Sequence, residues 1–268
     1  MGAIRNLRTT WAVIRTVANW PTYYAAASGL IRRPLVVYRL RNGLSFEARP
    51  RTLDTAVLKD VFAREVYALP GFEIRTGDVV IDIGAHIGLF AGYAARAAEN
   101  VTVLAFEPCP ANFSLLVRNL SRNALSNVRA FPSAVSASRG VEALHQSSNP
   151  AGHSFHFIEA GQPSVSVPTV SLEGIVHQHA LRVVNLLKMD CEGAEYEILA
   201  SSIPEPLGCV RRITMEAHTV DAVRTPEWIR RFLEEQGYAV SSVAKPGGTS
   251  LMWATRESGV SLSPQTAT

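Results

Sequence analysis

The first chemically suggestive segment of the sequence is a short turn with two glycines. Residues 79–83 form an apolar run of strand length, and Gly84-Ala85-His86-Ile87-Gly88 follows directly. Small residues between a strand and a helix let the backbone approach a ligand closely, and the helix start offers unpaired N–H groups. The turn lacks the middle glycine of a dinucleotide motif and the Gly-Lys-Ser/Thr of a P-loop, which argues against a pyrophosphate or triphosphate ligand.

An acidic residue ends the next apolar run. Residues 101–106 lead into Glu107-Pro108, and Glu107 stands 23 residues after Gly84. A carboxylate at such a place can accept hydrogen bonds from the two hydroxyls of a ribose. The alternative is that Glu107 caps the helix that begins near Pro110. Because the glycine turn precedes it, the sequence favours an adenosine ligand without a pyrophosphate.

Three carboxylates follow the strand predicted at residues 184–189. Asp190 and Glu192 precede the next helix and can point into a cleft at the carboxyl edge of the sheet, where open α/β sheets bind ligands. Glu195 falls in the first turn of that helix, where a carboxylate favours the helix dipole, so its expected role is structural. Asp190 and Glu192 are candidates for aligning a hydroxyl nucleophile and taking its proton.

Two more polar residues end the strand predicted at residues 210–216. Alternation along an extended chain places Glu216 and His218 on one side. A histidine titrates near neutral pH, which suits a general base that Glu216 could orient. The alternative is a hydrogen-bonded histidine without a chemical role. His153 lies in a segment at 147–157 that is expected to be a mobile loop over the acceptor, and it is either a further base candidate or a solvated loop histidine.

These groups also raise the question of a metal ion. Carboxylates with water suit Mg²⁺, but no spacing here requires it, and a fixed carboxylate or imidazole can deprotonate a hydroxyl unaided. Mg²⁺ is therefore possible, and no metal ligand is predicted. Cys109 and Cys191 lie beside the motifs without an arranged base, so no thiol chemistry is predicted.

A doubly wound, mostly parallel seven-stranded α/β sheet would bring these residues together. Apolar runs alternate with helical periodicity from residue 78 onward. Strands are predicted at 79–83, 101–106, 128–132, 184–189, 210–216, 239–243 and 250–254, and helices at 88–99, 111–124, 193–202 and 226–236. The connection around Lys245 to Gly248 is too short for a crossover helix, so the last two strands should pair antiparallel.

The first 70 residues are predicted to form an extension to this sheet. Helical spacing indicates one or two amphipathic helices over 4–31, broken at Pro21. Asn42-Gly43 between two short strands predicts a type I′ hairpin, and Asp54 is expected to cap a helix that ends at residues 69–71.

The predicted organisation has three parts: 1–70 as an N-terminal helical and β-hairpin cap over the acceptor site, 71–257 as the main domain, and 258–268 as a flexible tail. Contact of the N-terminal helices with a membrane surface is an alternative, because Trp11 and Trp20 stand among basic residues. Dimerisation through these helices is another, and a homo-oligomer remains open.

Composition excludes several classes of protein. The chain has 268 residues, of which 47% are hydrophobic and 18% charged, so it is expected to fold. A net charge of +3 is too small to predict a nucleic-acid partner. Three cysteines without a Cys-x-x-Cys pair argue against a disulfide scaffold or zinc finger. No stretch approaches the ~20 apolar residues of a membrane span, and no signal peptide is evident, so a cytoplasmic location is expected.

Three blocks of the sequence resemble the signature blocks of FkbM-family methyltransferases: Asp82-Ile-Gly-Ala-His-Ile-Gly-Leu-Phe90, Phe106-Glu-Pro-Cys-Pro-Ala-Asn112 and Leu187-Lys-Met-Asp190-Cys-Glu192-Gly193-Ala-Glu195. The resemblance implies a class I methyltransferase fold and S-adenosylmethionine as cofactor, with S-adenosylhomocysteine as product. It assigns the glycine turn to the amino-acid part of the cofactor, Glu107 with Pro108 to the ribose, and Ser133-Ala134 to the neighbourhood of the adenine. The cofactor-binding residues predicted in this way are Asp82, Gly84, Ala85, His86, Gly88, Glu107, Pro108, Ser133, Ala134 and Asp190.

The resemblance also implies the reaction, which is O-methylation of a hydroxyl on a sugar, polyketide or other secondary metabolite. The predicted catalytic residues are Asp190, Glu192, Glu216 and His218, and the predicted partner is a small-molecule acceptor. Two other classes stay open: a nucleotide-dependent oxidoreductase, and a noncatalytic relative that only binds S-adenosylmethionine.

Overall fold

The computed structural model describes residues 2–147, 152–157, 161–245 and 247–256, with side chains from residue 8 onward. The tail predicted at 258–268 and residues 148–151 of the predicted mobile loop lie outside the described residues. Within the described residues, no helix is both long enough and apolar enough to cross a bilayer.

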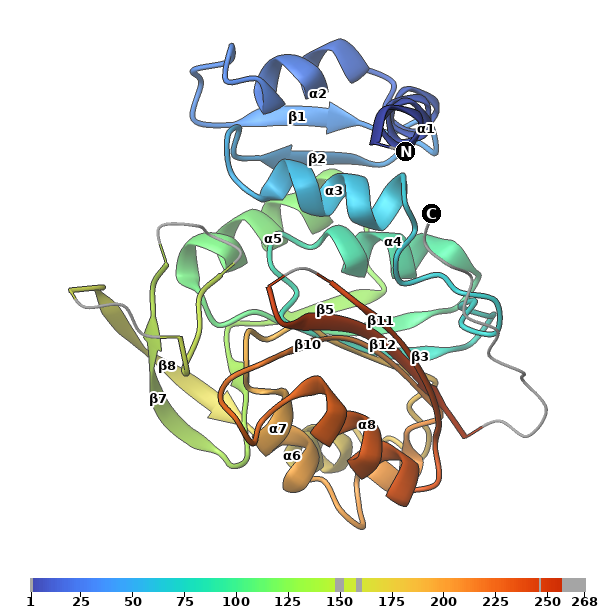
Figure 1. Cartoon of the computed structure of the whole chain (residues 1–268), viewed down its shortest axis with the longest axis vertical. Helices are drawn as coiled ribbons and strands as arrows, with labels where there is room; N and C mark the ends of the chain where they lie inside the picture. The colour runs from blue at the N-terminus through green and yellow to red at the C-terminus, as the bar shows by residue number, and fades with distance from the viewer. Residues whose placement is uncertain (1, 148–151, 158–160, 246, 257–268) are drawn as a thin grey trace.

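A seven-stranded sheet forms the middle layer of the molecule (Figure 1). In spatial order its strands are β11 (Ala239–Ala244), β12 (Thr249–Thr255), β10 (Arg212–His218), β9 (Leu186–Met189), β3 (Val79–Ile83), β4 (Thr102–Phe106) and β5 (Val128–Phe131). β12 pairs antiparallel with both of its neighbours, and the other pairings are parallel. The predicted doubly wound α/β fold and the antiparallel pairing of the last two strands are therefore confirmed.

Helices cover both faces of this sheet (Figure 1). α4 (Leu89–Ala97) and α5 (Pro110–Arg122) lie on one face, and α6 (Leu172–Gln178), α7 (Glu195–Ala200) and α8 (Pro226–Glu235) lie on the other. A short 3-10 turn, η1 (Leu207–Cys209), precedes β10. In β3, Val80 joins the apolar cluster on the first face and Ile81 the cluster on the second. Burial on both faces explains why the strands read as continuous apolar runs.

The strand order reverses at β3, which has β4 on one side and β9 on the other. The connections that leave β3 and β9 at their carboxyl ends therefore run in opposite directions. Such a reversal opens a crevice beyond the carboxyl edge, and open α/β sheets bind ligands there.

The N-terminal extension forms a layer at one end of the molecule (Figure 1). It consists of α1 (Gly2–Thr16), α2 (Trp20–Ala27), a hairpin of β1 (Val36–Arg39) and β2 (Ser45–Ala48), and α3 (Asp54–Phe62). The hairpin is confirmed, but the type I′ turn is wrong. Gly43 has a positive φ of 90° whereas Asn42 does not, and the loop spans three residues between Leu40 and Leu44. A type I′ turn needs a positive φ at both central residues.

Three helix boundaries in the extension differ from the predictions, and one of them is the end of α3 at Phe62, short of the predicted end at residues 69–71. The break between α1 and α2 falls before Pro21, which lies in the first turn of α2, where its missing N–H costs no hydrogen bond. Asp54 is the first residue of α3 and makes no cap, because Leu53 occupies the capping position. The Asp54 carboxylate instead contacts Arg49 and His86, as described below.

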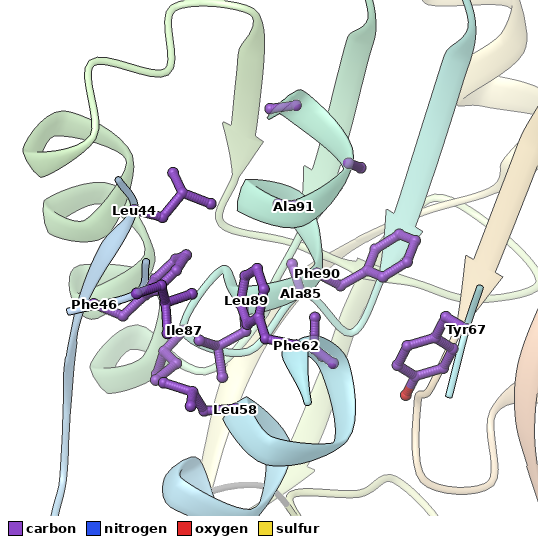
Figure 2. Packing of buried hydrophobic residues seen from close by; sticks show 14 of the residues in the cluster. Leu44, Phe46, Leu58, Phe62, Tyr67, Ala85, Ile87, Leu89, Phe90 and Ala91 are labelled. Atoms are coloured by element: carbon purple, nitrogen blue, oxygen red, sulfur yellow. The ribbon is translucent and has the colours of Figure 1, made fainter. Parts of the chain in front are cut away.

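The extension shares its apolar core with one face of the sheet. Figure 2 shows Phe46 of β2 and Leu58 of α3 beside Ile87 and Leu89, which follow the glycine turn. All four side chains are buried in one continuous cluster. The predicted boundary at residue 70 therefore does not separate two hydrophobic cores, and α3 is held directly against the turn that follows β3.

A second, three-stranded sheet was not predicted. It has the order β6 (Ala134–Val135), β8 (Ser164–Val170) and β7 (Gly140–His145). Most side chains of β7 and β8 are at least partly exposed, so their apolar pattern is weak, and Pro168 interrupts β8. Helix α6 was missed as well, although Ser171 caps it by accepting a hydrogen bond from the Gly174 N–H at 3.0 Å.

Candidate active site

One cavity opens at the carboxyl edge of the sheet, where the strand order reverses. It measures about 850 Å³, including the open volume at its mouth, which falls within the range of small-molecule sites. Its wall combines the glycine turn, the end of β4, the end of β9, helix α3 and the segment at residues 152–157. The lining residues used below are Gly84, Ala85, His86, Glu107, Pro108, Ala134, Asp190, Glu192, Tyr67, His153 and Phe155.

The glycines of the turn are required by protein packing. A Cβ on Gly84, whose φ is +74°, would lie 1.9 Å from the carbonyl oxygen of Asp190. A Cβ on Gly88 would lie 2.5 Å from Leu116 Cδ1. Gly84 thus lets the β3 turn touch the β9 end, and this contact places Asp190 beside the turn. The predicted contact of the glycine turn with a cofactor stays a prediction.

Glu107 is buried at the base of the cavity. Its Oε2 accepts the His86 N–H at 2.8 Å, and its Oε1 accepts the Cys109 N–H at 3.0 Å and the Asn112 side-chain amide at 3.3 Å. Burial raises the pKa of Glu107, while His86 and these hydrogen bonds oppose the shift. A carboxylate has about four acceptor sites, so Glu107 keeps acceptor capacity for a ligand hydroxyl.

Three predicted cofactor residues do not line the cavity: Asp82, Gly88 and Ser133. Asp82 is fully buried behind the turn, where its Oδ1 lies 3.1 Å from Lys188 Nζ. Lys188 also donates to the Gly84 carbonyl at 2.8 Å, so the pair fixes the turn from behind. Ser133 is buried next to Ala134, and only Ala134 reaches the wall.

Asp190 and Glu192 are the two carboxylates of the β9 end that line the cavity. Tyr67, which follows α3, donates from its hydroxyl to Asp190 Oδ2 at 3.4 Å. Glu192 has a positive φ of 53°, which is unusual for a residue with a Cβ. Burial, together with the charges of Asp190 and Glu195, raises the pKa of Glu192 to about 7, although His218 opposes the shift.

His218 lies behind Glu192 and is held by two carboxylates. Its Nδ1 is 3.0 Å from Glu195 Oε1, and its Nε2 is 3.5 Å from Glu192 Oε2. Burial alone would lower the pKa of His218, but the hydrogen bond and charge of Glu195, with Glu192 and Asp190, raise it to about 10. The imidazole is therefore a cation at neutral pH, which makes it a partner of Glu192 and a poor proton acceptor.

Glu195 has the structural position that was expected, and its contacts are specific. It is fully buried and accepts the Cys191 N–H at 3.2 Å and the Gly193 N–H at 3.0 Å, besides its contact with His218. Glu195 thus fixes both the backbone that carries Glu192 and the ring that faces it.

Glu216 stands apart from the cavity wall. Its Oε2 is 2.6 Å from Lys245 Nζ in the connection between β11 and β12. Asp190 and His218 lie close enough to influence its pKa, which burial raises. Glu216 therefore belongs to the charged cluster, one layer further from the cavity than Asp190 and Glu192.

Three side chains of this cluster have the chemistry of a metal-binding group. One ligand atom each from Asp190, Glu192 and His218 lies within 4.8 Å of the others. The imidazolium of His218 places a positive charge among these carboxylates. The thiol of Cys191 also lines the cavity, and burial raises its pKa well above the ordinary value, so it is protonated at neutral pH.

The segment at 152–157 contributes to the cavity wall, and its predicted role as a loop over the acceptor stays a prediction. His153 and Phe155 both line the cavity. His153 Nδ1 accepts the Ser147 N–H at 3.0 Å, and burial lowers its pKa, so the ring is neutral at pH 7.

Sequence reasoning missed the contribution of the extension to the site. Arg49 donates to Asp54 Oδ2 at 2.9 Å and to Asn112 Oδ1 at 2.8 Å, and His86 Nε2 lies 3.1 Å from Asp54 Oδ1. This connected set of charged and polar side chains links the hairpin, α3 and the glycine turn. Only the burial of the charged Asp54 marks these residues as more than surface residues, and burial is not visible in a single sequence.

The FkbM methyltransferase domain model matches residues 82–240 of this chain. The chain is 28% identical over 229 residues to methyltransferase sdnD of Sordaria araneosa, covering 74% of this chain and 87% of that protein. It is 28% identical over 193 residues to 31-O-demethyl-FK506 methyltransferase FkbM of Streptomyces tacrolimicus, covering 61% of this chain and 74% of that protein. It is 27% identical over 211 residues to hexuronic acid methyltransferase AglP of Haloferax volcanii, covering 77% of this chain and 83% of that protein.

Among solved structures, Aeropyrum pernix fibrillarin in complex with natively bound S-adenosyl-L-methionine aligns with a TM-score of 0.45 and 13% identity, covering 83% of this chain and 94% of that chain. The family match is the informative comparison, because it spans more than half of the chain and contains the glycine turn, Glu107, Asp190 and Glu192. The chain belongs to the FkbM methyltransferase family and is a methyltransferase.

Proposed function

We propose that this methyltransferase uses S-adenosylmethionine to methylate a hydroxyl group of a sugar, polyketide or other secondary metabolite. The observation that carries the proposal is the shared cavity. Its wall contains Glu107, a buried acid that can bind a ribose. The same wall contains Asp190 and Glu192, two carboxylates that can accept a hydrogen bond or a proton.

The residues of the cavity fit the charge and shape of the cofactor. Its sulfonium and ammonium groups are cations, and the carboxylate of Asp190 supplies negative charge at the cavity wall. Glu107 would hold the ribose hydroxyls, and the apolar wall near Pro108 and Ala134 would contact the adenine. When bound, S-adenosylmethionine supplies a methyl group on a positively charged sulfur that a hydroxyl oxygen can attack.

The chain itself must orient the acceptor hydroxyl and take its proton. Glu192 suits the second task, because its pKa of about 7 lets it be a carboxylate above neutral pH and still bind a proton. In this reaction the new O–CH₃ bond would form as the S–CH₃ bond of the cofactor breaks, S-adenosylhomocysteine would leave, and the acceptor proton would move to Glu192. Asp190 would accept a hydrogen bond from the acceptor or the cofactor, held in place by Tyr67.

His218 and Glu195 have positioning roles in this proposal. The imidazolium faces Glu192, and Glu195 fixes the ring through Nδ1. Glu216 is further away and would set the charge of the cluster together with Lys245. Since the cation of His218 already balances part of the negative charge, no metal ion is included.

The acceptor class rests on the names of the relatives. One is a 31-O-demethyl-FK506 methyltransferase and another a hexuronic acid methyltransferase. Both names describe hydroxyl-bearing small molecules, and we carry that class, without the individual compounds, to this chain.

Transfer of a labelled methyl group from S-adenosylmethionine tests the proposal. The enzyme is incubated with hydroxylated sugars, uronic acids and macrolides, and the product is analysed for an O-methyl group. Glu192→Gln should lower kcat about 100-fold or more, in the range of a lost general base, with cofactor affinity unchanged. Cofactor binding without transfer to any acceptor would favour the noncatalytic alternative, and binding of NAD alone would favour the oxidoreductase.

A further inference from the structure

The N-terminal layer carries a strong excess of positive charge. The first 51 residues hold nine arginines and one carboxylate, Glu47, which gives a balance of +8. The whole chain sums to +3, so the remaining residues carry −5. Glu47 already contacts Arg118 and Arg122 of α5. The charge of this end of the molecule is therefore opposite to that of the rest.

Most of these arginines are free to meet a partner. Seven of them are exposed, and none of the seven makes an ion pair within the part of the chain that the structure describes: Arg8, Arg15, Arg32, Arg33, Arg39, Arg41 and Arg51. Figure 1 places α1, α2 and the β1–β2 hairpin together at one end of the molecule, on the far side of the sheet from α6, α7 and α8. The charge is thus gathered at one end.

Large apolar side chains are exposed in the same layer. Leu30, after α2, is 78% exposed, the highest value among the large hydrophobic residues described. Trp11 is 65% exposed and lies between Arg8 and Arg15 at helical spacing, so all three share a face of α1. Trp20, which begins α2, is 38% exposed.

We propose that this layer docks on the surface of an anionic lipid bilayer. Arginines attract anionic headgroups, and tryptophans are favoured at the level where headgroups meet acyl chains. A nucleic acid would use the same arginines, but an exposed leucine gains nothing from a phosphate backbone and gains free energy from a bilayer interface. The arginines and the exposed apolar side chains together select the bilayer.

Vesicle binding tests the proposal with the full chain. Sedimentation with vesicles of phosphatidylcholine and phosphatidylglycerol is compared with vesicles of phosphatidylcholine alone. Binding should require phosphatidylglycerol and weaken as salt rises. Arg8→Glu/Arg15→Glu should lower the partition coefficient about tenfold or more, because each basic residue near an anionic surface contributes about 1 kcal/mol.

Two further variants separate the contributions. Trp11→Ser should lower partitioning while preserving its dependence on salt, because the arginines remain. The control Arg139→Glu/Arg182→Glu makes the same charge change at exposed arginines outside this layer. Its partition coefficient should be closer to that of the wild type than the partition coefficient of Arg8→Glu/Arg15→Glu is. Circular dichroism melting verifies that each variant is folded.

Three results would overturn the proposal: no binding to the anionic vesicles, equal loss in the Arg139→Glu/Arg182→Glu control, or tighter binding to an RNA oligonucleotide than to the vesicles. None of the substituted side chains lines the catalytic cavity. A calorimetric titration with S-adenosylmethionine therefore reports on the cofactor proposal independently of vesicle binding.

Discussion

At the scale of single residues, the site assigns different tasks to carboxylates that look alike in the sequence. Glu192 lines the cavity and has a pKa near 7, whereas Glu195, three residues later, is fully buried and fixes His218. Glu107 is buried too, but it keeps acceptor capacity at the cavity base. Burial and hydrogen-bond partners, which the residue type does not reveal, distinguish these carboxylates and are the reason why we propose Glu192 as the base and Glu195 as a positioning residue.

The pKa of Glu192 predicts the pH dependence of the reaction. A carboxylic acid with a pKa of about 7 is protonated below that pH and cannot take a proton. With saturating cofactor and acceptor, kcat should therefore rise with pH and level off above about 7. Glu192→Gln should give a low rate without this step. A wild-type profile that is flat from pH 5.5 to 8.5 would contradict Glu192 as the base.

Gly84 offers a test of the contact that places Asp190. Gly84→Ala should lower the free energy of unfolding by about 3 kcal/mol or more, since overpacking adds to the strain of a positive φ. Gly77→Ala is the matched control, because Gly77 has a φ of +81° and nothing within 4 Å of the added Cβ. The control should cost only about 1–2 kcal/mol. Equal losses in urea unfolding would show that the contact with Asp190 does not require glycine.

At the scale of elements, the extension contributes residues to the cavity wall and to the contacts next to it. α3 supplies Asp54 to the group that holds His86, and the residue that touches Asp190, Tyr67, follows α3 in the chain. Hydrogen bonds from Arg49 and His86 outweigh the effect of burial and hold the pKa of Asp54 well below its usual value.

Asp54→Asn should destabilise the protein by about 2–4 kcal/mol at pH 7, because it leaves Arg49 without its buried partner. Asp60→Asn, on the same helix, removes only a partly exposed pair with Arg64 and should cost less than about 1 kcal/mol. The contribution of Asp54 is present above the ordinary carboxyl pKa of about 4 and is lost as the pH falls below it. The difference in the free energy of unfolding between wild type and Asp54→Asn, measured in urea, should therefore shrink below pH 4. A difference that stays constant down to pH 2.5 would show that Asp54 is not part of an ionised pair.

The sequence was sufficient for the central strands, which are mostly buried. β3, β4 and β9 are largely apolar, and the turns after β3 and β9 carry polar residues that a buried core would not contain. The sheet β6-β8-β7 was missed because its strands are short or largely exposed, which weakens the period of two. The type I′ turn failed because Asn-Gly also fits a three-residue loop in which only the glycine has a positive φ.

The residues of the candidate site could likewise be predicted only in part. Asp190, Glu192 and Glu107 were found because each directly follows a strand at the carboxyl edge. Tyr67, Arg49 and Asp54 were not found, because they reach the site through tertiary packing of a segment with no motif. The predicted contacts of Asp82 and Ser133 with a cofactor stay predictions, and their burial behind the wall favours a positioning role.

At the scale of the whole molecule, two surface features lie in different parts of the fold. The cavity lies at the carboxyl edge of the main sheet, and the exposed arginines lie in the N-terminal layer. α3 belongs to this layer and also contributes to the cavity wall. The proposed function depends first on binding of S-adenosylmethionine in the cavity.

Calorimetric titration of the wild type and of Glu107→Ala with S-adenosylmethionine, S-adenosylhomocysteine and NAD tests this claim most directly. The adenosyl ligands should bind the wild type, with or without a chelator, and NAD should not. Loss of charge-assisted hydrogen bonds should weaken binding to Glu107→Ala by about 1.5–3 kcal/mol, roughly 10- to 150-fold. Unchanged affinity in a folded Glu107→Ala variant, or binding of NAD in place of the adenosyl ligands, would contradict the account.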